Sequence, residues 1–148
     1  MIPPRPSGFG PWDDYLFGIA DAVAAKSKDP KRKVGALIVD ERRTIRATGY
    51  NGFPRGVVDD HRLHDREAKL GIIVHAEANA ICAAARAGVP LDGCSLYCTR
   101  QPCSRCAGLI VQAGLVRVAF LTTPVSERWA ADFALAEAIL LEAGVAVQ

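Results

Sequence analysis

The sequence has few aromatic residues, little net charge and no long apolar run. Aromatic residues make up 7% of its 148 positions, and the formal net charge is only +2. So small a charge argues against a broad basic surface that wraps duplex nucleic acid, although it leaves room for a small phosphate-binding pocket. Every apolar stretch is interrupted well before the roughly 20 residues that a transmembrane helix needs. We therefore expect no membrane association.

The N-terminal segment lacks the apolar core of a secretory signal peptide. Its first residues are rich in proline, and we expect residues 1–11 to form an extended arm. The chain has five cysteines, and an odd number without a signal peptide does not suggest a disulfide framework. We therefore expect a cytoplasmic protein with reduced thiols.

The chain does contain alternating helical and strand-like patterns. Apolar residues at helical spacing begin near Trp12, and this helix should end before Pro30 because the residue preceding a proline disfavours the α conformation. Two strand-like segments around a charged turn then indicate a hairpin, at residues 34–39 and 44–50. The later elements are helices at 75–87, 102–113 and 126–143, and strands at 95–99, 116–121 and 145–147.

This order of elements predicts the fold class. Helices that alternate with strands after a hairpin indicate an α/β protein, with a mixed five-stranded sheet in a three-layer α-β-α sandwich. A chain of 148 residues is expected to form one domain, residues 1–148. The interval 57–69 is polar and without periodicity, which predicts a long loop of the kind that often has a function.

Two short motifs contain the candidate metal ligands. One is His75-x-Glu77 and the other is Cys103-x-x-Cys106, and each lies at the start of a predicted helix. Cysteines three residues apart in a first helical turn can point at one metal, and a helix N-terminus favours the thiolate form. Two thiolates and one imidazole suit zinc, and three protein ligands leave its fourth position open to water. The motifs therefore predict a zinc site.

The carboxylate of Glu77 is the candidate proton carrier. Glu77 lies two residues after His75, so it can reach a group bound to the metal without binding the metal itself. Zinc lowers the pKa of bound water towards about 7. Glu77 can then accept the proton, pass it to a ring nitrogen and protonate a departing amine. Taken alone, Glu77 would instead be a carboxylate that interacts with the helix dipole.

Each motif alone has other interpretations. A Cys-x-x-Cys pair also occurs in redox sites and in structural zinc sites. The redox interpretation leaves His75 and Glu77 without a role. A structural zinc site needs a fourth protein ligand. The candidates for that ligand are Cys94, Cys98, His61 and His64.

With these motifs, the chain resembles the cytidine and deoxycytidylate deaminase superfamily over roughly residues 12–147. Beyond the zinc motifs, the resemblance rests on segments 27–36 and 49–60. The loop 50–56 most closely resembles the deoxycytidylate (dCMP) deaminase branch. The resemblance implies a cytidine deaminase-like fold, a Zn²⁺ cofactor and hydrolytic conversion of dCMP to dUMP and ammonia.

The resemblance also implies roles in substrate binding. The backbone N–H of Ala76 would bind the pyrimidine carbonyl, and Asn51 would hydrogen-bond the sugar hydroxyl. An Asn-Gly pair such as Asn51-Gly52 is also a common turn sequence. The candidates for the 5′-phosphate are Ser27, Lys28 and Arg55, which could equally be exposed loop residues.

Two segments depart from the pattern of the branch. Arg100-Gln101 places charged and polar groups beside the zinc cysteines, where the branch usually has apolar ones, and could alter the pocket. The interval 57–69 could close over substrate, contact an effector or bind a second zinc ion. Because members of the branch form dimers or hexamers and some respond to dCTP and dTTP, the resemblance implies a homo-oligomer and makes these nucleotides candidate effectors.

The motifs predict the reaction more firmly than the substrate. Within the same chemistry, the alternatives to dCMP are a modified cytosine nucleotide, a nucleoside and a purine base. A nucleic-acid-editing deaminase is a further alternative, and so is a nucleic-acid-binding module. The low net charge and the lack of a basic, aromatic-rich tail count against both.

Overall fold

The structure, a computed structural model, describes residues 8–148 and is built on one sheet. The strand order is β2-β1-β3-β4-β5. The strands are β1 (Gly35–Val39), β2 (Ile45–Tyr50), β3 (Ser95–Cys98), β4 (Arg117–Phe120) and β5 (Ala146–Val147). Strand β1 pairs antiparallel with β2 and β3, whereas the pairs β3–β4 and β4–β5 are parallel. The mixed five-stranded sheet predicted from the sequence is confirmed.

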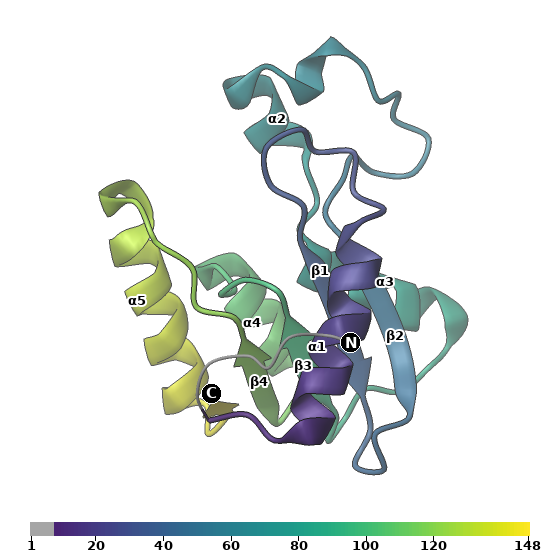
Figure 1. Cartoon of the computed structure of the whole chain (residues 1–148), viewed down its shortest axis with the longest axis vertical. Helices are drawn as coiled ribbons and strands as arrows, with labels where there is room; N and C mark the ends of the chain where they lie inside the picture. The colour runs from purple at the N-terminus through teal and green to yellow at the C-terminus, as the bar shows by residue number, and fades with distance from the viewer. Residues whose placement is uncertain (1–7) are drawn as a thin grey trace.

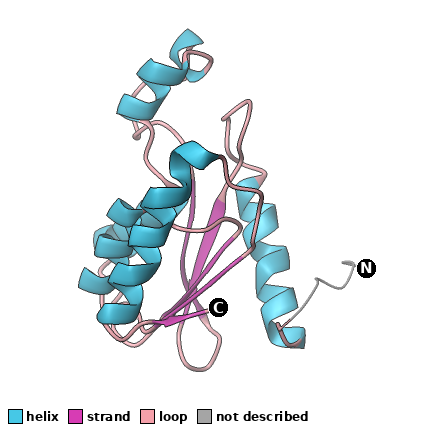
Figure 2. Cartoon of the chain, turned by 90° about the vertical axis from the view of Figure 1, so that its left-hand side faces the viewer, coloured by secondary structure: helices cyan, strands magenta, loops and turns pink. Residues whose placement is uncertain are grey.

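Helices cover both faces of this sheet (Figure 1 and Figure 2). One face carries α1 (Pro11–Ala24), and the other carries α3 (Ala76–Ala87), α4 (Ser104–Gln112) and α5 (Glu127–Glu142). Helix α3 ends at Gly88, whose φ of 68° lies in the left-handed region that glycine adopts at little cost. The predicted three-layer sandwich is therefore confirmed.

The two faces of the sheet have separate apolar cores. Leu16 and Phe17 of α1 pack with Tyr97 on one face. The larger core on the other face is formed between the sheet and α3–α5. Its largest buried side chains are Ile38, Leu96, Ile110, Val118 and Leu140. Strand β1 is buried along its whole length, because helices cover both of its faces.

Two details of the sequence prediction are wrong. The interval 57–69 is not a structureless loop: it contains a 3₁₀ helix, η1 (His61–Leu63), and the start of α2 (Arg66–Ile72). Periodicity could not reveal a helix of only two turns, although Asp65 caps it by accepting a hydrogen bond from the Ala68 N–H. Helix α4 begins at Ser104 rather than at residue 102, because Cys103 is its N-cap. Helix α2 extends beyond the sandwich (Figure 1).

The predicted N-terminal arm is only partly visible. Its residues 1–7 lie outside the described part of the chain, and Pro11 already belongs to α1. The ring of Phe9 packs edge-on against Phe17 with ring centroids 4.8 Å apart. The described end of the arm is therefore docked on the core. Within residues 8–148, none of the helices combines the length and the apolar composition needed to cross a membrane.

A glycine lets α3 lie close to the sheet. Gly49 faces the first turn of α3, where an added Cβ would overlap the backbone of Ala76 and Ala80. His75 and Glu77 belong to the start of the same helix. This close approach therefore also sets how far both residues lie below the protein surface.

Replacement of Gly49 by alanine should therefore disturb the candidate site together with the fold. The added methyl group would meet helix backbone, which cannot swing aside as a side chain can. Overpacking of this kind costs about 1–3 kcal/mol of the free energy of unfolding. We expect Gly49→Ala to lower the midpoint of urea unfolding and the amount of metal bound per chain.

Gly108→Ala is the matched control, because nothing lies within 4 Å of a Cβ added at that position in α4. Alanine in a helix interior is favoured over glycine by about 0.5–1 kcal/mol, so this variant should unfold at an equal or higher urea concentration. Unchanged unfolding and metal content in Gly49→Ala would contradict the close approach of α3.

Candidate metal centre and active site

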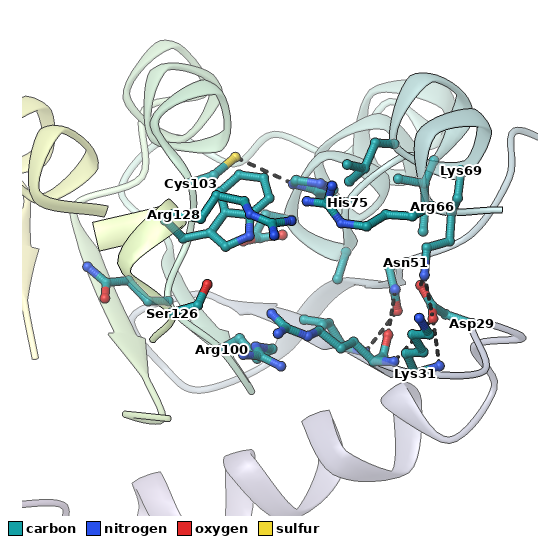
Figure 3. Close-up of a pocket in the computed structure, with 18 of the residues that line it drawn as sticks. Asp29, Lys31, Asn51, Arg66, Lys69, His75, Arg100, Cys103, Ser126 and Arg128 are labelled. Atoms are coloured by element: carbon teal, nitrogen blue, oxygen red, sulfur yellow. Dashed lines mark hydrogen bonds and ion pairs between the residues drawn. The ribbon is translucent and has the colours of Figure 1, made fainter. Parts of the chain in front are cut away.

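Two helix N-termini bring together the three predicted metal ligands. His75 is the N-cap of α3, Cys103 is the N-cap of α4, and Cys106 lies in the first turn of α4. The His75 Nδ1 atom is 3.4 Å from Cys103 Sγ and 3.5 Å from Cys106 Sγ. Figure 3 shows the first of these contacts. All three donor atoms lie within 4.8 Å of one another.

The spacing of these donors fits zinc. With Zn–S bonds of roughly 2.3 Å and a Zn–N bond of roughly 2.0 Å, tetrahedral geometry places nitrogen and sulfur roughly 3.5 Å apart. The separations of 3.4 Å and 3.5 Å agree with that value. Within residues 8–148, the group contains these three residues and no fourth histidine, cysteine or carboxylate. The set therefore matches a site with an open coordination position better than a closed structural one.

The two cysteines form a hydrogen bond with each other that shifts their pKa values in opposite directions. A hydrogen bond from the Cys106 thiol lowers the pKa of Cys103 to about 4, and the same bond raises the pKa of Cys106. The hydrogen bond with Cys103 also raises the pKa of His75. A divalent cation stabilises both thiolates and the neutral imidazole, so metal binding displaces these protons.

Glu77 lies beside the ligands but is not one of them. Its side chain is 4% exposed, and it lines the same cavity as His75 and Cys103. Burial raises the pKa of Glu77, while a hydrogen bond with the buried Cys98 side chain partly opposes that rise. A glutamate in such surroundings can hold a proton at a higher pH than an exposed glutamate, as a general acid–base must.

The cavity in front of these residues has a volume of about 420 Å³. The first turns of α5 form one wall, and α2 with the residues that follow it forms another (Figure 3). The α5 wall consists of Ser126, Arg128, Trp129 and Phe133. The α2 wall consists of Arg66, Lys69, Leu70 and Ile73. The cavity is thus partly aromatic, partly aliphatic and rich in cations.

Asn51 lines the cavity, as the resemblance implies, but its side chain is also anchored to the backbone. Its Oδ1 atom accepts a hydrogen bond of 2.8 Å from the Val34 N–H, and its Nδ2 atom donates one of 2.8 Å to the Arg32 carbonyl. Neither Asn51 nor Gly52 has a positive φ, so the pair does not form the turn that its sequence suggests. An amide nitrogen carries two hydrogens, which leaves one for a ligand.

The three residues expected at the phosphate do not line the cavity. Ser27 is 2% exposed and donates a hydrogen bond of 2.8 Å to the Asn51 carbonyl, so it ties two loops together. Lys28 pairs with Asp59 at 2.7 Å on the surface, and Arg55 is exposed. Other cations line the cavity instead: Lys31, Arg32, Arg66, Lys69, Arg100 and Arg128. Of these cations, the sequence analysis singled out only Arg100 by its own position, although Arg66 and Lys69 lie in the interval 57–69 that could close over substrate.

One of these cations is neutralised within the protein. The Lys69 ammonium lies 3.1 Å from the Asp29 carboxylate, with side-chain exposures of 12% and 4%. Burial alone would raise the pKa of Asp29. Hydrogen bonds from the N–H groups of Lys31 and Arg32, together with Lys69, outweigh burial and hold that pKa below its ordinary value. The pair connects α2 to the loop before β1.

Comparison with known proteins agrees with this geometry. A model of the cytidine and deoxycytidylate deaminase zinc-binding region matches residues 11–122. The chain belongs to this family. The match includes all three candidate ligands and Glu77 but ends before α5. As the description of the family states, its metal is zinc.

Individual members of the family resemble the chain over most of its length. A probable deoxycytidylate deaminase of Drosophila melanogaster is 41% identical over 79% of this chain, and the match spans 62% of that protein's length. A deoxycytidylate deaminase of Mycobacterium phage D29 is 40% identical over 74% of this chain and 93% of that protein.

Solved structures of the family share the fold. The dCMP deaminase of cyanophage S-TIM5 superposes with a TM-score of 0.75 at 27% identity, over 94% of this chain and 98% of that one. The same phage enzyme in complex with dCMP and dUMP gives a TM-score of 0.72 over 95% of this chain and 98% of that one.

The assignment of the ligands predicts the metal content of the purified protein. The wild type should carry one zinc ion per chain. Loss of a direct ligand in Cys106→Ser should weaken zinc binding by more than about tenfold, because even residues that only support a ligand have effects of that size. Metal analysis by mass spectrometry after dialysis measures this loss. Cys82→Ser is the control, since Cys82 is exposed on α3. An equal loss of zinc in both variants would contradict the assignment.

The buried ion pair predicts a pH-dependent contribution to stability. Asp29→Asn should lower the free energy of unfolding by about 3–5 kcal/mol at pH 7, because it leaves the Lys69 charge buried without a partner. Since the pKa of Asp29 is lowered in the folded state, the contribution is complete above its unfolded pKa of about 3.9 and is lost as the pH falls through the folded pKa.

Urea unfolding of both proteins between pH 3 and pH 7 tests this expectation. Asp59→Asn is the matched control, because the pair of Asp59 with Lys28 is exposed and such pairs contribute little. A constant difference between Asp29→Asn and the wild type at every pH would contradict the role of the charge.

Proposed function

We propose that the protein is a hydrolytic deaminase that converts dCMP to dUMP and ammonia. One observation carries the proposal: a zinc-type donor set and a buried glutamate meet at one end of a cavity lined by cations. The names of the relatives support dCMP as the substrate, as does the complex of the phage enzyme with dCMP and dUMP. A volume of about 420 Å³ is within the usual range for small-molecule sites.

Each residue of the metal motifs has a role in this reaction. His75, Cys103 and Cys106 would hold zinc, which when bound lowers the pKa of a water molecule and so provides a nucleophile near neutral pH. Glu77 would accept the proton of that water on its carboxylate and deliver it to N3 of the cytosine ring. The water oxygen adds to C4 and becomes the new carbonyl oxygen.

Glu77 would also complete the reaction. Glu77 would then take the proton of the hydroxyl group now on C4 and pass it to the exocyclic amine. As the C4–N bond breaks, the oxygen forms the carbonyl and the amine leaves as ammonia. The burial that raises the pKa of Glu77 lets this residue hold the proton between the two transfers. The overall change, dCMP and water to dUMP and ammonia, needs no further reactant.

Two further residues would orient the substrate. Ala76 is the first residue of α3, where backbone N–H groups have no partner within the helix, so its N–H can bind the pyrimidine carbonyl. Asn51, held by the backbone of residues 32 and 34, can hydrogen-bond the sugar hydroxyl. The cations of the cavity, rather than Ser27, Lys28 or Arg55, are the groups placed to meet a phosphate.

Broader properties follow from the resemblance to the dCMP deaminase branch. On that basis we infer that residues 1–148 act as one deaminase domain in a homo-oligomer, a dimer or a hexamer, in the cytoplasm. The same resemblance makes dCTP and dTTP candidate effectors, and an assay of dCMP deamination with and without them tests that inference.

Loss of the carboxylate should abolish activity without loss of the metal. Glu77→Gln keeps the shape of the side chain but cannot carry the protons, and removal of a general acid–base typically slows a reaction by about 10²–10⁴-fold. Deamination is followed by the change in ultraviolet absorbance as dCMP becomes dUMP, and zinc is measured on the same sample.

The control is Glu137→Gln, an exposed position on α5 that does not line the cavity. The wild type should be screened against dCMP, CMP, deoxycytidine, cytosine, 5-substituted dCMP and guanine. Full activity of Glu77→Gln would refute the mechanism, and preference for a substrate other than dCMP would refute the substrate assignment.

A further inference from the structure

Arg100 is an unusual cation in the cavity, because it is half-buried and no acid pairs with it among the described residues. It follows β3 and lines the cavity. Among the described residues, the one hydrogen bond of its side chain is 3.2 Å long and goes to the neutral hydroxyl of Thr123. The other half-buried cation of the cavity, Lys69, is paired with Asp29. A guanidinium has five N–H donors, so most of the donors of Arg100 are free to bind a ligand.

A second guanidinium lies close to Arg100. Burial, followed by the positive charge of Arg32, lowers the pKa of Arg100. Arg32 also lines the cavity, and within residues 8–148 its hydrogen bonds involve only its backbone atoms. Among the described residues, neither guanidinium is in an ion pair with an acid, and two like charges near each other destabilise the folded protein. An anion bound between them would remove that repulsion.

The position of Arg100 in the cavity suits the phosphate of a nucleotide, which lies at the opposite end from the base. In Figure 3, Arg100 and Lys31 lie on one side of the cavity, while His75 and Cys103 lie on the other. A substrate whose base reaches the metal ligands would therefore extend its sugar and phosphate towards the side that carries Arg100. Asn51, the candidate for the sugar contact, also lines this cavity.

We propose that Arg100, with Arg32 beside it, binds the phosphate monoester of the substrate and makes the protein prefer a nucleotide to a nucleoside. This assignment rests on the proposed function and specifies which residues recognise its phosphate. Arginine suits the task because its planar fork can donate two parallel hydrogen bonds to phosphate oxygens. The unusual Arg100 in the sequence thereby gains a role.

Arg100 also has a structural contact that any test must separate from phosphate binding. Its hydrogen bond to Thr123 holds the connection between β4 and α5, and the neighbouring Gln101 donates a hydrogen bond of 3.3 Å to the Phe133 carbonyl of α5. If Arg100 served only to dock this segment, Thr123→Val would have the same effect as loss of Arg100.

The test compares dCMP with deoxycytidine in the wild type and in five variants, one of which is Arg55→Met. Arg100→Met should lower kcat/KM for dCMP by roughly 10- to 100-fold, the size expected for lost charge-assisted hydrogen bonds, and leave kcat/KM for deoxycytidine unchanged. Arg32→Met should show the same selective loss to a smaller extent. Thr123→Val and Arg86→Met, an exposed position on α3, should retain the wild-type preference for dCMP.

Each of the following results would overturn the assignment. Equal losses for dCMP and deoxycytidine in Arg100→Met would show a structural role, as would the same losses in Thr123→Val. An unchanged preference in Arg100→Met would exclude Arg100 from phosphate recognition. Loss of the preference in Arg55→Met instead of Arg100→Met would place the phosphate where the sequence resemblance expects it.

A binding measurement keeps this inference separate from the proposed function. Calorimetry with dUMP and deoxyuridine reports phosphate recognition without catalysis, and zinc analysis verifies that each variant is intact. A wild-type protein that deaminates neither substrate would refute the proposed function. If it still preferred dUMP over deoxyuridine and Arg100→Met lost that preference, the phosphate assignment would stand. A wild type with no such preference would overturn it.

Discussion

The arrangement of the site depends on one constraint: two helix N-termini must meet closely enough for one metal ion to bind both. The donor atoms of His75, Cys103 and Cys106 lie within 4.8 Å of one another, although 28 residues separate the first two ligands in the chain. Helix α3 reaches this point because Gly49 lets it lie against β2. Asp132 of α5 holds the first residue of α4 in place. Its carboxylate accepts hydrogen bonds of 3.0 Å and 2.6 Å from the Ser104 N–H and hydroxyl. The sheet and α5 thus fix the geometry that the ligands require.

The charges around this point divide the cavity into two functional regions. At the metal end, a buried glutamate with a raised pKa can exchange protons. Away from it, cations outnumber acids, and only Lys69 among the half-buried cations has a carboxylate partner. The proposed chemistry needs the first region and the proposed recognition of an anionic substrate needs the second. Helix α5 forms one wall of the cavity and supports α4, although it lies beyond the region that the family model matches.

Local sequence was sufficient for the sheet, for the helices that cover it and for the candidate metal ligands, but not for α2 or for the rest of the cavity. Apolar patterning predicted the sheet and the four helices that cover it, and the spacing of His75, Glu77 and the cysteines predicted the candidate site. Helix α2 was missed because seven residues are too few for a periodic pattern. The phosphate candidates Ser27, Lys28 and Arg55 lie outside the cavity because the distant partners Asn51 and Asp59 hold the first two elsewhere. Which cations converge depends on how α2, the loop before β1, β3 and α5 pack, and no local pattern encodes that arrangement.

The central claim is that the metal is held by three protein ligands and keeps one position for solvent. X-ray absorption at the zinc edge of the purified holoprotein tests this claim most directly. The account predicts two sulfur neighbours at roughly 2.3 Å and two nitrogen or oxygen neighbours at roughly 2.0 Å, with the signature of a single imidazole. A third sulfur or a second imidazole in the zinc shell would mean a closed structural site and would contradict the account.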